Sequence, residues 1–224
     1  MAAIHAKSKT FFQTIRRSFV DVPVDAAHDN AIATGEFLEA ADSLTTLFDQ
    51  LGSVAFTPVK NDMLGNIKSA TSNALVLRLK PHTKSLVLNE LKTKKHTATE
   101  GLLWLVRGLD FTAQALRDNQ THPSTELSTS FRTAYNTTLK PHHSWVVKPI
   151  FSAAMSATPY RKDFYAKIGV RDGGEGQEGI GGQEELRRWL EALEKQVGVL
   201  KEFLGRRDVK LSVRAKIARS GTRH

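Results

Sequence analysis

Residues 101–111 read Gly-Leu-Leu-Trp-Leu-Val-Arg-Gly-Leu-Asp-Phe, and this stretch decides the fold. Apolar side chains recur at spacings of three and four from Leu102 to Leu116, which is the pattern of a helix that buries one face. We therefore expect a single helix over residues 97–118. Trp104 lies two positions off this apolar stripe, roughly 200° around the helix, so the pattern alone does not assign it to the core.

Two glycines, Gly101 and Gly108, lie one turn to either side of Trp104. Each of them costs about 1 kcal/mol of helix stability relative to alanine. The missing side chains would leave one flat face of the indole open, and such a face can stack on the C–H face of a sugar. The alternative is a tryptophan in the core of a helix that is buried from two sides. The residues alone leave both interpretations open.

The other periodic segments also predict helices. They carry apolar residues at helical spacing, and they cover residues 34–51, 59–68, 123–159 with a bend or restart at Pro141, and 183–204. Thr34 is the expected N-cap of the first of these helices. A weak alternation at residues 75–79 is the only strand pattern. The sequence predicts an all-α fold with roughly six to eight helices packed in layers.

The composition limits the possible function classes. The chain of 224 residues has no cysteine, which excludes disulfides, thiolate metal sites and a cysteine nucleophile, and fits a reducing cytosol. No secretory signal is visible, and no apolar run approaches the length of a membrane span. The sequence has neither a Gly-x-Ser-x-Gly elbow nor a His-Glu-x-x-His zinc site. We therefore expect a ligand-binding protein that is not an enzyme and has no metal or cofactor.

The chain is expected to form one domain over residues 10–204, between a disordered N-terminus at 1–9 and a basic tail at 205–224. The tail holds seven Lys and Arg against one Asp, so it carries +6 of the net charge of +9. A solvated terminus is the first expectation for it, and attraction to an anionic membrane is an alternative. The tail has no aromatic residue, so we expect no nucleic-acid partner. Residues 171–182 are glycine-rich and are expected to form a flexible linker.

Three polar side chains are candidates for ligand contacts. Asp62 and Asn66 are four residues apart and share a helix face, where together they could accept from and donate to sugar hydroxyls. Asp62 could equally be a first-turn acid that the helix dipole favours. His143 falls on an apolar stripe with Val147, so it could donate to a ligand carbonyl or be a satisfied core histidine.

Trp145 lies off the same stripe and close to Lys148. An indole on the outside of a helix beside a cation suits a membrane interface, where amphipathic rings are favoured. A singly exposed tryptophan without a role is the alternative.

Three segments together point to a known family. Residues 51–66 read Leu-Gly-Ser-Val-Ala-Phe-Thr-Pro-Val-Lys-Asn-Asp-Met-Leu-Gly-Asn, residues 101–109 begin Gly-Leu-Leu-Trp, and residues 140–164 begin Lys-Pro-His-His-Ser-Trp. These segments resemble the glycolipid transfer proteins, and among them the fungal heterokaryon-incompatibility (het-c) type. The resemblance implies a two-layer helical sandwich. It also implies intermembrane transfer of a glycosphingolipid without ATP, cofactor or covalent chemistry.

The resemblance implies roles for individual residues. Asp62 and Asn66 would bind the sugar and the ceramide amide. Trp104 would lie under the sugar ring, and His143 would bond the amide carbonyl. The membrane-touching position is matched by Trp145, with Lys148 beside it. Apolar residues would line the tunnel for the lipid chains, namely Val59, Leu139, Val147, Phe151 and Met155.

The implied ligand is a glucosylceramide or galactosylceramide. The implied protein is a cytosolic monomer, peripheral at membranes, that touches a membrane surface transiently. The sister group that carries ceramide-1-phosphate has a cation where this chain has Trp104, as phosphate recognition requires, so Trp104 favours a sugar headgroup. The alternatives are a ceramide-1-phosphate carrier and a glycosphingolipid sensor or incompatibility factor that binds lipid without bulk transfer.

The chain departs from the family pattern in three places. The family has a Lys three residues after the Asn, where this chain has Ser69. Lys68 stands one place earlier and would take that role if one residue is deleted. Residues 68–88 as a whole resemble the family poorly. The glycine-rich linker and the basic tail look like additions.

Overall fold

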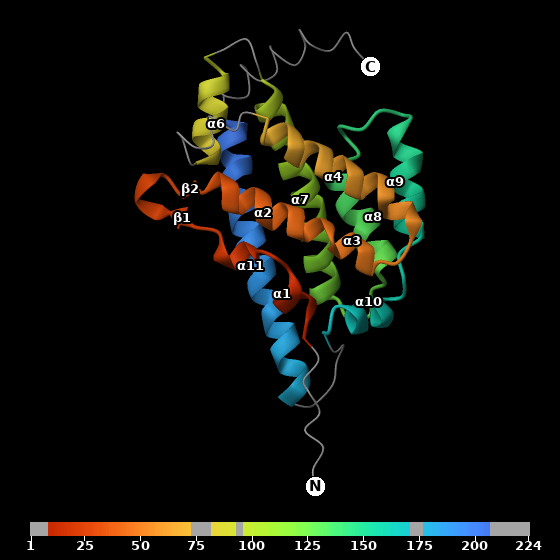
Figure 1. Ribbon diagram of the computed structural model, residues 1–224. Helices are drawn as coiled ribbons and strands as arrows, with labels where there is room; N and C mark the ends of the chain where they lie inside the picture. Colours follow the sequence, from red (N-terminus) through yellow and green to blue (C-terminus); the bar gives the residue numbers. More distant parts are fainter. Residues whose placement is uncertain (1–8, 73–81, 93–95, 171–176, 207–224) are drawn as a thin grey trace.

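The computed structural model describes residues 9–72, 82–92, 96–170 and 177–206, and Figure 1 shows how they are arranged. The α-helices are α1 (Phe11–Thr14), α2 (Thr34–Thr45), α3 (Leu47–Gln50), α4 (Thr57–Ala70), α6 (Thr83–Glu90), α7 (Thr97–Thr121), α8 (Leu127–Thr137), α9 (Val147–Ser156), α10 (Arg161–Lys167) and α11 (Gln177–Gly205). The shorter elements are the 3₁₀ turns η1 (Phe19–Asp21), η2 (Ala26–His28) and η3 (Val54–Phe56) and the strands β1 (Val24–Asp25) and β2 (Ala31–Ile32). The two strands pair antiparallel, with Val24 opposite Ile32.

Helix α7 lies at the centre of the fold. It packs against α8 and α11, and α4 crosses it together with α2 (Figure 1). The apolar stripe of α7 is buried, since Leu102, Leu105, Leu109 and Leu116 are each at most 2% exposed. The helices thus form two layers with the core between them. This arrangement confirms the all-α, two-layer fold predicted from the sequence.

The start of α7 is capped by a side chain from α6. The Glu90 carboxylate accepts the backbone N–H of Ala98 at 3.2 Å and that of Thr99 at 2.7 Å, and Glu90 itself is buried. The first N–H groups of a helix have no partner inside the helix, and the dipole favours an acid there. The helix that carries Trp104 is therefore anchored at its N-terminus.

The bend or restart expected at Pro141 within residues 123–159 is a restart. The segment forms two helices, α8 and α9, joined by turns at residues 138–146. Helix α8 ends at its C-cap, Thr138, whose hydroxyl and backbone N–H both donate to the carbonyl of Ala134, at 2.6 and 3.0 Å. Pro141 then lacks an N–H and clashes with the turn before it. His143 consequently lies on a turn and not on a face of a regular helix.

The flexible linker expected at residues 171–182 is also wrong in its second half. Helix α11 begins at Gln177, and Gly182 lies inside it. A Cβ added to Gly182 would lie 2.8 Å from the carbonyl oxygen of Gly169. This glycine permits a close approach between two backbone segments. Residues 171–176 lie outside the described residues.

The remaining expectations differ from the structure mainly at helix ends. The helix expected over 34–51 divides into α2 and α3, and Thr34 is the first residue of α2, with Ala33 as its N-cap. The weak strand expected at 75–79 lies outside the described residues, as do residues 1–8 and 207–224 of the two expected termini. Where the structure describes the chain, it has no helix long and apolar enough to cross a membrane.

Candidate functional site

The site begins where α4 crosses α7 at Gly101. A Cβ added to Gly101 would lie 2.6 Å from Cβ of Ser69 and 2.8 Å from both the carbonyl oxygen of Asn66 and the backbone nitrogen of Ala70. Contacts this short do not occur between real atoms, so only glycine permits the two backbones to lie this close. The glycine was expected to clear a face of the Trp104 indole. The structure shows instead that it seats α4 against α7.

The crossing brings Asn66 past the turn that carries Trp104. Met63 lies against Gly108, and Ser69 lies against Gly101. The part of α4 between those two contacts, which includes Asn66, therefore passes over the part of α7 between Gly101 and Gly108. Two polar segments that are distant in sequence meet at this crossing.

Asp62 and Asn66 form a hydrogen-bonded pair on α4. The Asn66 amide donates to Oδ2 of Asp62 at 3.1 Å. The protein around Asp62 removes water from it and so raises the pKa of its carboxyl above the ordinary value, although the residue has exposed surface and the bond from Asn66 acts in the opposite direction. Asp62 is not in the first turn of α4, so the helix-dipole interpretation of this residue is wrong. The pair retains free lone pairs and an amide proton for a polar ligand.

Trp104 is half-buried, and three polar side chains surround its ring. The His143 ring lies nearly parallel to the indole, with centroids 5.8 Å apart and an angle of 21°. His142 meets the indole edge-on at 6.4 Å. The Arg107 guanidinium lies 4.7 Å from the ring centroid, within the range of a cation–π contact. Trp104 is therefore not a fully buried core residue, and its ring is not free of neighbouring side chains.

His143 connects this polar cluster to the apolar core. Its Nδ1 lies 3.3 Å from the Tyr135 hydroxyl, and its ring lies 4.5 Å from that of Phe151. Burial, and after it the nearby charges of His142, Arg107 and Lys148, together lower the pKa of His143 to about 4. The imidazole is thus neutral at pH 7. When the Tyr135 hydroxyl donates to Nδ1, the proton on Nε2 is available to a ligand carbonyl.

Lys68 does not share the face of α4 that meets α7. Asp62, Asn66 and Ser69 follow one another at spacings of four and three, and the unbroken helix places Lys68 about 100° away from Ser69. Lys68 is exposed. The cation beside Trp104 is instead Arg107, which sequence reasoning missed. Its spacing of three from Trp104 on the same helix was a usable signal, because residues at that spacing are neighbours.

The five residues expected to line a lipid tunnel belong to one apolar core. Val59, Leu139, Phe151 and Met155 are each at most 5% exposed, and Val147 is partly buried against them. The Phe151 ring stacks on that of Tyr135, with centroids 5.4 Å apart and an angle of 11°. This core begins directly beneath His143, so a ligand at the polar cluster has apolar protein immediately below it.

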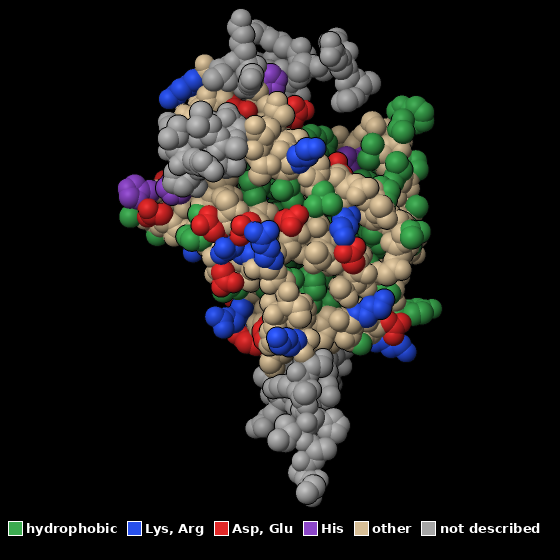
Figure 2. Space-filling model, in the orientation of Figure 1, with side chains coloured by type: hydrophobic (Ala, Val, Ile, Leu, Met, Phe, Trp, Pro, Cys, Tyr) green, Lys and Arg blue, Asp and Glu red, His purple; other side chains and the backbone are tan. Residues whose placement is uncertain are grey.

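Helix α9 and the turns on both sides of it carry an exposed apolar edge. Trp145 is 83% exposed, and Val146, Ile150 and Tyr160 are exposed as well. Figure 2 shows hydrophobic side chains gathered along this side of the molecule, over α9. We refer to these four residues as the apolar edge. Exposed apolar patches of this kind mark surfaces that contact other molecules or lipid.

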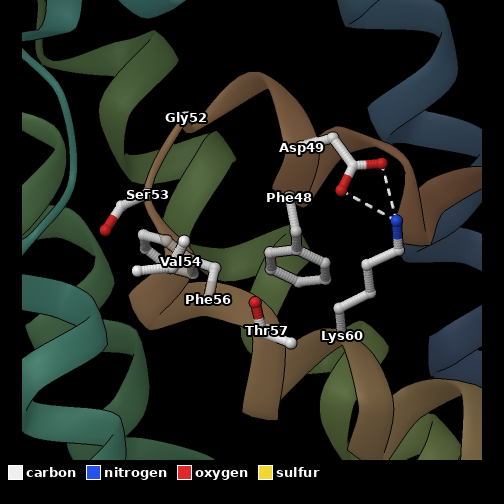
Figure 3. A pocket seen from close by; sticks show the side chains of 8 residues that line it. All are labelled: Phe48, Asp49, Gly52, Ser53, Val54, Phe56, Thr57 and Lys60. Atoms are coloured by element: carbon white, nitrogen blue, oxygen red, sulfur yellow. Dashed lines mark hydrogen bonds and ion pairs between the residues drawn. The ribbon is translucent and has the colours of Figure 1, made fainter.

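A separate pocket lies between α3 and the start of α4 (Figure 3). It has a volume of about 290 Å³, and the stacked rings of Phe48 and Phe56 form part of its wall. Lys60 in this pocket donates to both carboxylate oxygens of Asp49, at 2.7 and 2.6 Å. The positive charge here is neutralised. Val54 beside it is 90% exposed.

The comparisons with known proteins agree with this geometry. The family model described as "Glycolipid transfer protein (GLTP)" matches residues 32–170. A glycolipid transfer protein of Aureobasidium melanogenum is 57% identical over 202 residues, which cover 90% of this chain and 96% of the relative. This chain belongs to the glycolipid transfer protein family. The family is one of lipid carriers.

Solved structures of the family have the same fold. The crystal structure of HET-C2, a fungal glycolipid transfer protein, has a TM-score of 0.82 and 58% identity, and the match covers 90% of this chain and all of that one. The GLTP-fold structure of FAPP2, described as selecting simple glycosphingolipids, has a TM-score of 0.76 and 33% identity. That match covers 89% of this chain and 97% of the other. These likenesses confirm the expected family and its fungal het-c type.

Proposed function

We propose that this protein carries glycosphingolipids between membranes. The sugar binds at the α4–α7 crossing, and the ceramide chains enter the apolar core beneath His143. Membership of the glycolipid transfer protein family and the identity to the fungal member support this function. The observation that carries it is the half-buried Trp104, with the Asp62–Asn66 pair on the helix that crosses it and His143 beside its ring.

The headgroup contacts follow from the chemistry of these side chains. The Trp104 indole offers an apolar ring for the C–H face of a sugar, once the Arg107 guanidinium shares or leaves that ring. The Asp62 carboxylate accepts from sugar hydroxyls, and Asn66 both donates and accepts. The neutral His143 donates from Nε2 to the amide carbonyl of the ceramide. Lys68 is not part of this set, because it lies on another face of α4.

The ceramide chains occupy the apolar core, which must open to admit them. The lining residues are Val59, Leu139, Val147, Phe151 and Met155. Burial of apolar surface stabilises a bound lipid by about 25 cal/mol per Å². Binding of this kind breaks no covalent bond, so the protein acts as a carrier and needs no catalytic group.

The apolar edge is the surface that touches a membrane. Lys148 lines a groove together with Trp145 of this edge, and an indole beside a cation suits the interface between water and lipid. The carrier is a cytosolic monomer, peripheral at membranes, and its ligands are of the glucosylceramide or galactosylceramide class. Transfer then consists of docking, uptake of one lipid, and release at a second membrane.

Transfer of fluorescent galactosylceramide between vesicles tests the proposal. Wild-type protein should transfer it rapidly, and Trp104→Ala should lower the rate at least tenfold through loss of ring stacking. Trp104→Phe keeps an aromatic ring and should lose less. Circular dichroism and thermal unfolding verify that both variants fold. Full transfer by the alanine variant would overturn the proposed role of the site.

Arg107 favours one second candidate, a carrier of ceramide-1-phosphate. A guanidinium at the ring of Trp104 could bond a phosphate in place of a sugar. Under our proposal, wild-type protein transfers galactosylceramide faster than ceramide-1-phosphate, and Arg107→Gln does not reverse the order. Faster transfer of ceramide-1-phosphate, abolished by Arg107→Gln, would favour the second candidate.

A further inference from the structure

A groove between α8 and α9 lies next to the apolar edge. It has a volume of about 420 Å³. The residues that line it are Arg132, Tyr135, Asn136, Lys140, Trp145, Lys148, Pro149, Ser152 and Met155. We call it the basic groove. Its wall includes Tyr135, whose hydroxyl also reaches His143, so the groove adjoins the polar cluster around Trp104.

The basic groove holds three cations and no acid. The whole segment of residues 127–162 contains no Asp or Glu. Lys140 donates to Oδ1 of Asn136 at 2.8 Å, and Arg132 donates to the Ser156 hydroxyl at 2.6 Å. Neither of them, nor Lys148, meets a carboxylate anywhere in the described part of the chain. The groove therefore carries unneutralised positive charge.

Several other surface cations of this protein are paired with acids. Lys60 pairs with Asp49, Arg117 pairs with Glu194, and Lys201 pairs with Asp110. The pocket of Figure 3 is close to neutral for this reason. The basic groove differs because Arg132 and Lys140 donate to a hydroxyl and an amide oxygen and to no carboxylate of the described residues. Those neutral partners position the cations and leave their charge available to an anion.

We propose that the basic groove binds the phosphate headgroup of an anionic phospholipid while the apolar edge enters the bilayer. The inference rests on the proposed membrane contact and adds to it a lipid selectivity. The neighbourhood of Trp145 commits the site to a lipid, because the indole places the groove at headgroup depth. Arg132 offers planar N–H pairs to the phosphate, and Lys140 and Lys148 add charge from the other side. The protein would thus dock preferentially on anionic membranes.

The test compares vesicles of phosphatidylcholine with vesicles that also contain phosphatidylserine. The groove variant is Arg132→Gln with Lys140→Gln. The matched control is Lys92→Gln with Lys195→Gln, which removes the same charge from exposed positions on other elements. A third variant, Arg132→Lys with Lys140→Arg, keeps the charge of the groove. Partition is measured by co-sedimentation, and thermal unfolding verifies folding.

The groove variant should bind vesicles that contain phosphatidylserine about 30-fold more weakly than wild-type protein, the effect of two cations close to an anionic surface. The control and the charge-keeping variant should retain most of the affinity. Binding to pure phosphatidylcholine should not change in any variant. Equal losses in the groove variant and the control would overturn the proposal, as would a wild-type protein that does not prefer phosphatidylserine.

Galactosylceramide transfer between pure phosphatidylcholine vesicles separates the two proposals. The groove variant should transfer at the wild-type rate there, since no anionic lipid is present. Absence of transfer by the wild-type protein would refute the carrier function while leaving the preference for phosphatidylserine intact. A wild-type protein that transfers galactosylceramide but does not prefer phosphatidylserine would refute the proposed groove and leave the carrier function standing.

Discussion

The α4–α7 crossing and the apolar edge meet at the turns around His143, yet they are built in opposite ways. At the crossing, two backbones touch through Gly101 and the polar side chains bond to one another. At the edge, apolar side chains are exposed and the neighbouring cations have no acidic partner among the described residues. The crossing is therefore held by packing within the protein. The edge has no such packing, and its exposed side chains are available to a membrane. Substitutions should affect stability at the crossing and membrane binding at the edge.

The largest effect is expected from Gly101→Ala. The added Cβ would force α4 away from α7, because backbone atoms of Asn66 and Ala70 occupy the space. The free energy of unfolding should fall by about 3 kcal/mol, as for an overpacked core. Gly108→Ala is the matched control, since its Cβ would meet Met63 at an ordinary 3.5 Å. The control should be neutral or more stable by up to about 1 kcal/mol through helix propensity.

Urea denaturation of the two alanine variants measures the difference. A similar loss in both would mean that the close approach at Gly101 does not decide the crossing. Galactosylceramide transfer should follow the same order, with Gly101→Ala impaired and Gly108→Ala near the wild-type rate.

A smaller effect is expected at His143, where the two regions meet. Its pKa of about 4 in the folded protein lies below the ordinary 6.5, so the unfolded chain binds more protons between these values. The stabilising contribution of the neutral imidazole is therefore complete above pH 6.5 and is lost as the pH falls toward 4. Between those limits wild-type protein should lose about 2 kcal/mol more stability than His143→Asn does.

The slope of unfolding free energy against pH, measured by urea denaturation at several pH values, gives this comparison. Only the slopes matter, because the Asn variant can differ in stability at every pH. Parallel curves for the two proteins would show that His143 is not buried as described.

The smallest effect on stability is expected at the edge. Trp145→Ala should change the free energy of unfolding by less than about 0.5 kcal/mol, because the side chain is 83% exposed. Its partition into vesicles should fall about tenfold, the effect of withdrawing roughly 60 Å² of apolar surface from lipid. Val20→Ser, at an exposed apolar residue of η1 outside the edge, should leave partition unchanged. A strong loss of stability in Trp145→Ala, or equal partition losses in both variants, would contradict the proposed difference between the α4–α7 crossing and the apolar edge.

The sequence predicted the fold better than the site, and particular residues explain why. The stripes of α7 and α11 are long and regular, so their period identified them as helices. Pro141 indicated the break between α8 and α9, but the length of the turns over residues 138–146 was not predicted, because periodicity does not encode how non-helical segments fold. Asp62 and Asn66 were predicted from their spacing within one helix. Gly101 was misinterpreted, because its reason lies on another helix.

Contacts between helices also account for the rest of the site. The cation at Trp104 is Arg107 and not Lys68; the spacing of three from Trp104 could have indicated Arg107, and the face of α4 that meets α7 excludes Lys68. The hydrogen bond between Tyr135 of α8 and His143 depends on how the turns after α8 fold back against that helix. Such contacts require the relative placement of elements, which the periodicity of a single sequence does not provide.

The most direct test of the sugar site is mass spectrometry of the lipid that copurifies with wild-type protein and with Trp104→Ala. If the α4–α7 crossing binds the sugar of a glycosphingolipid, the wild-type protein carries ceramide bearing a hexose, and the alanine variant carries far less of it. Recovery of phosphorylated ceramide or of glycerophospholipid alone, in equal amounts from both proteins, would contradict a sugar site at Trp104.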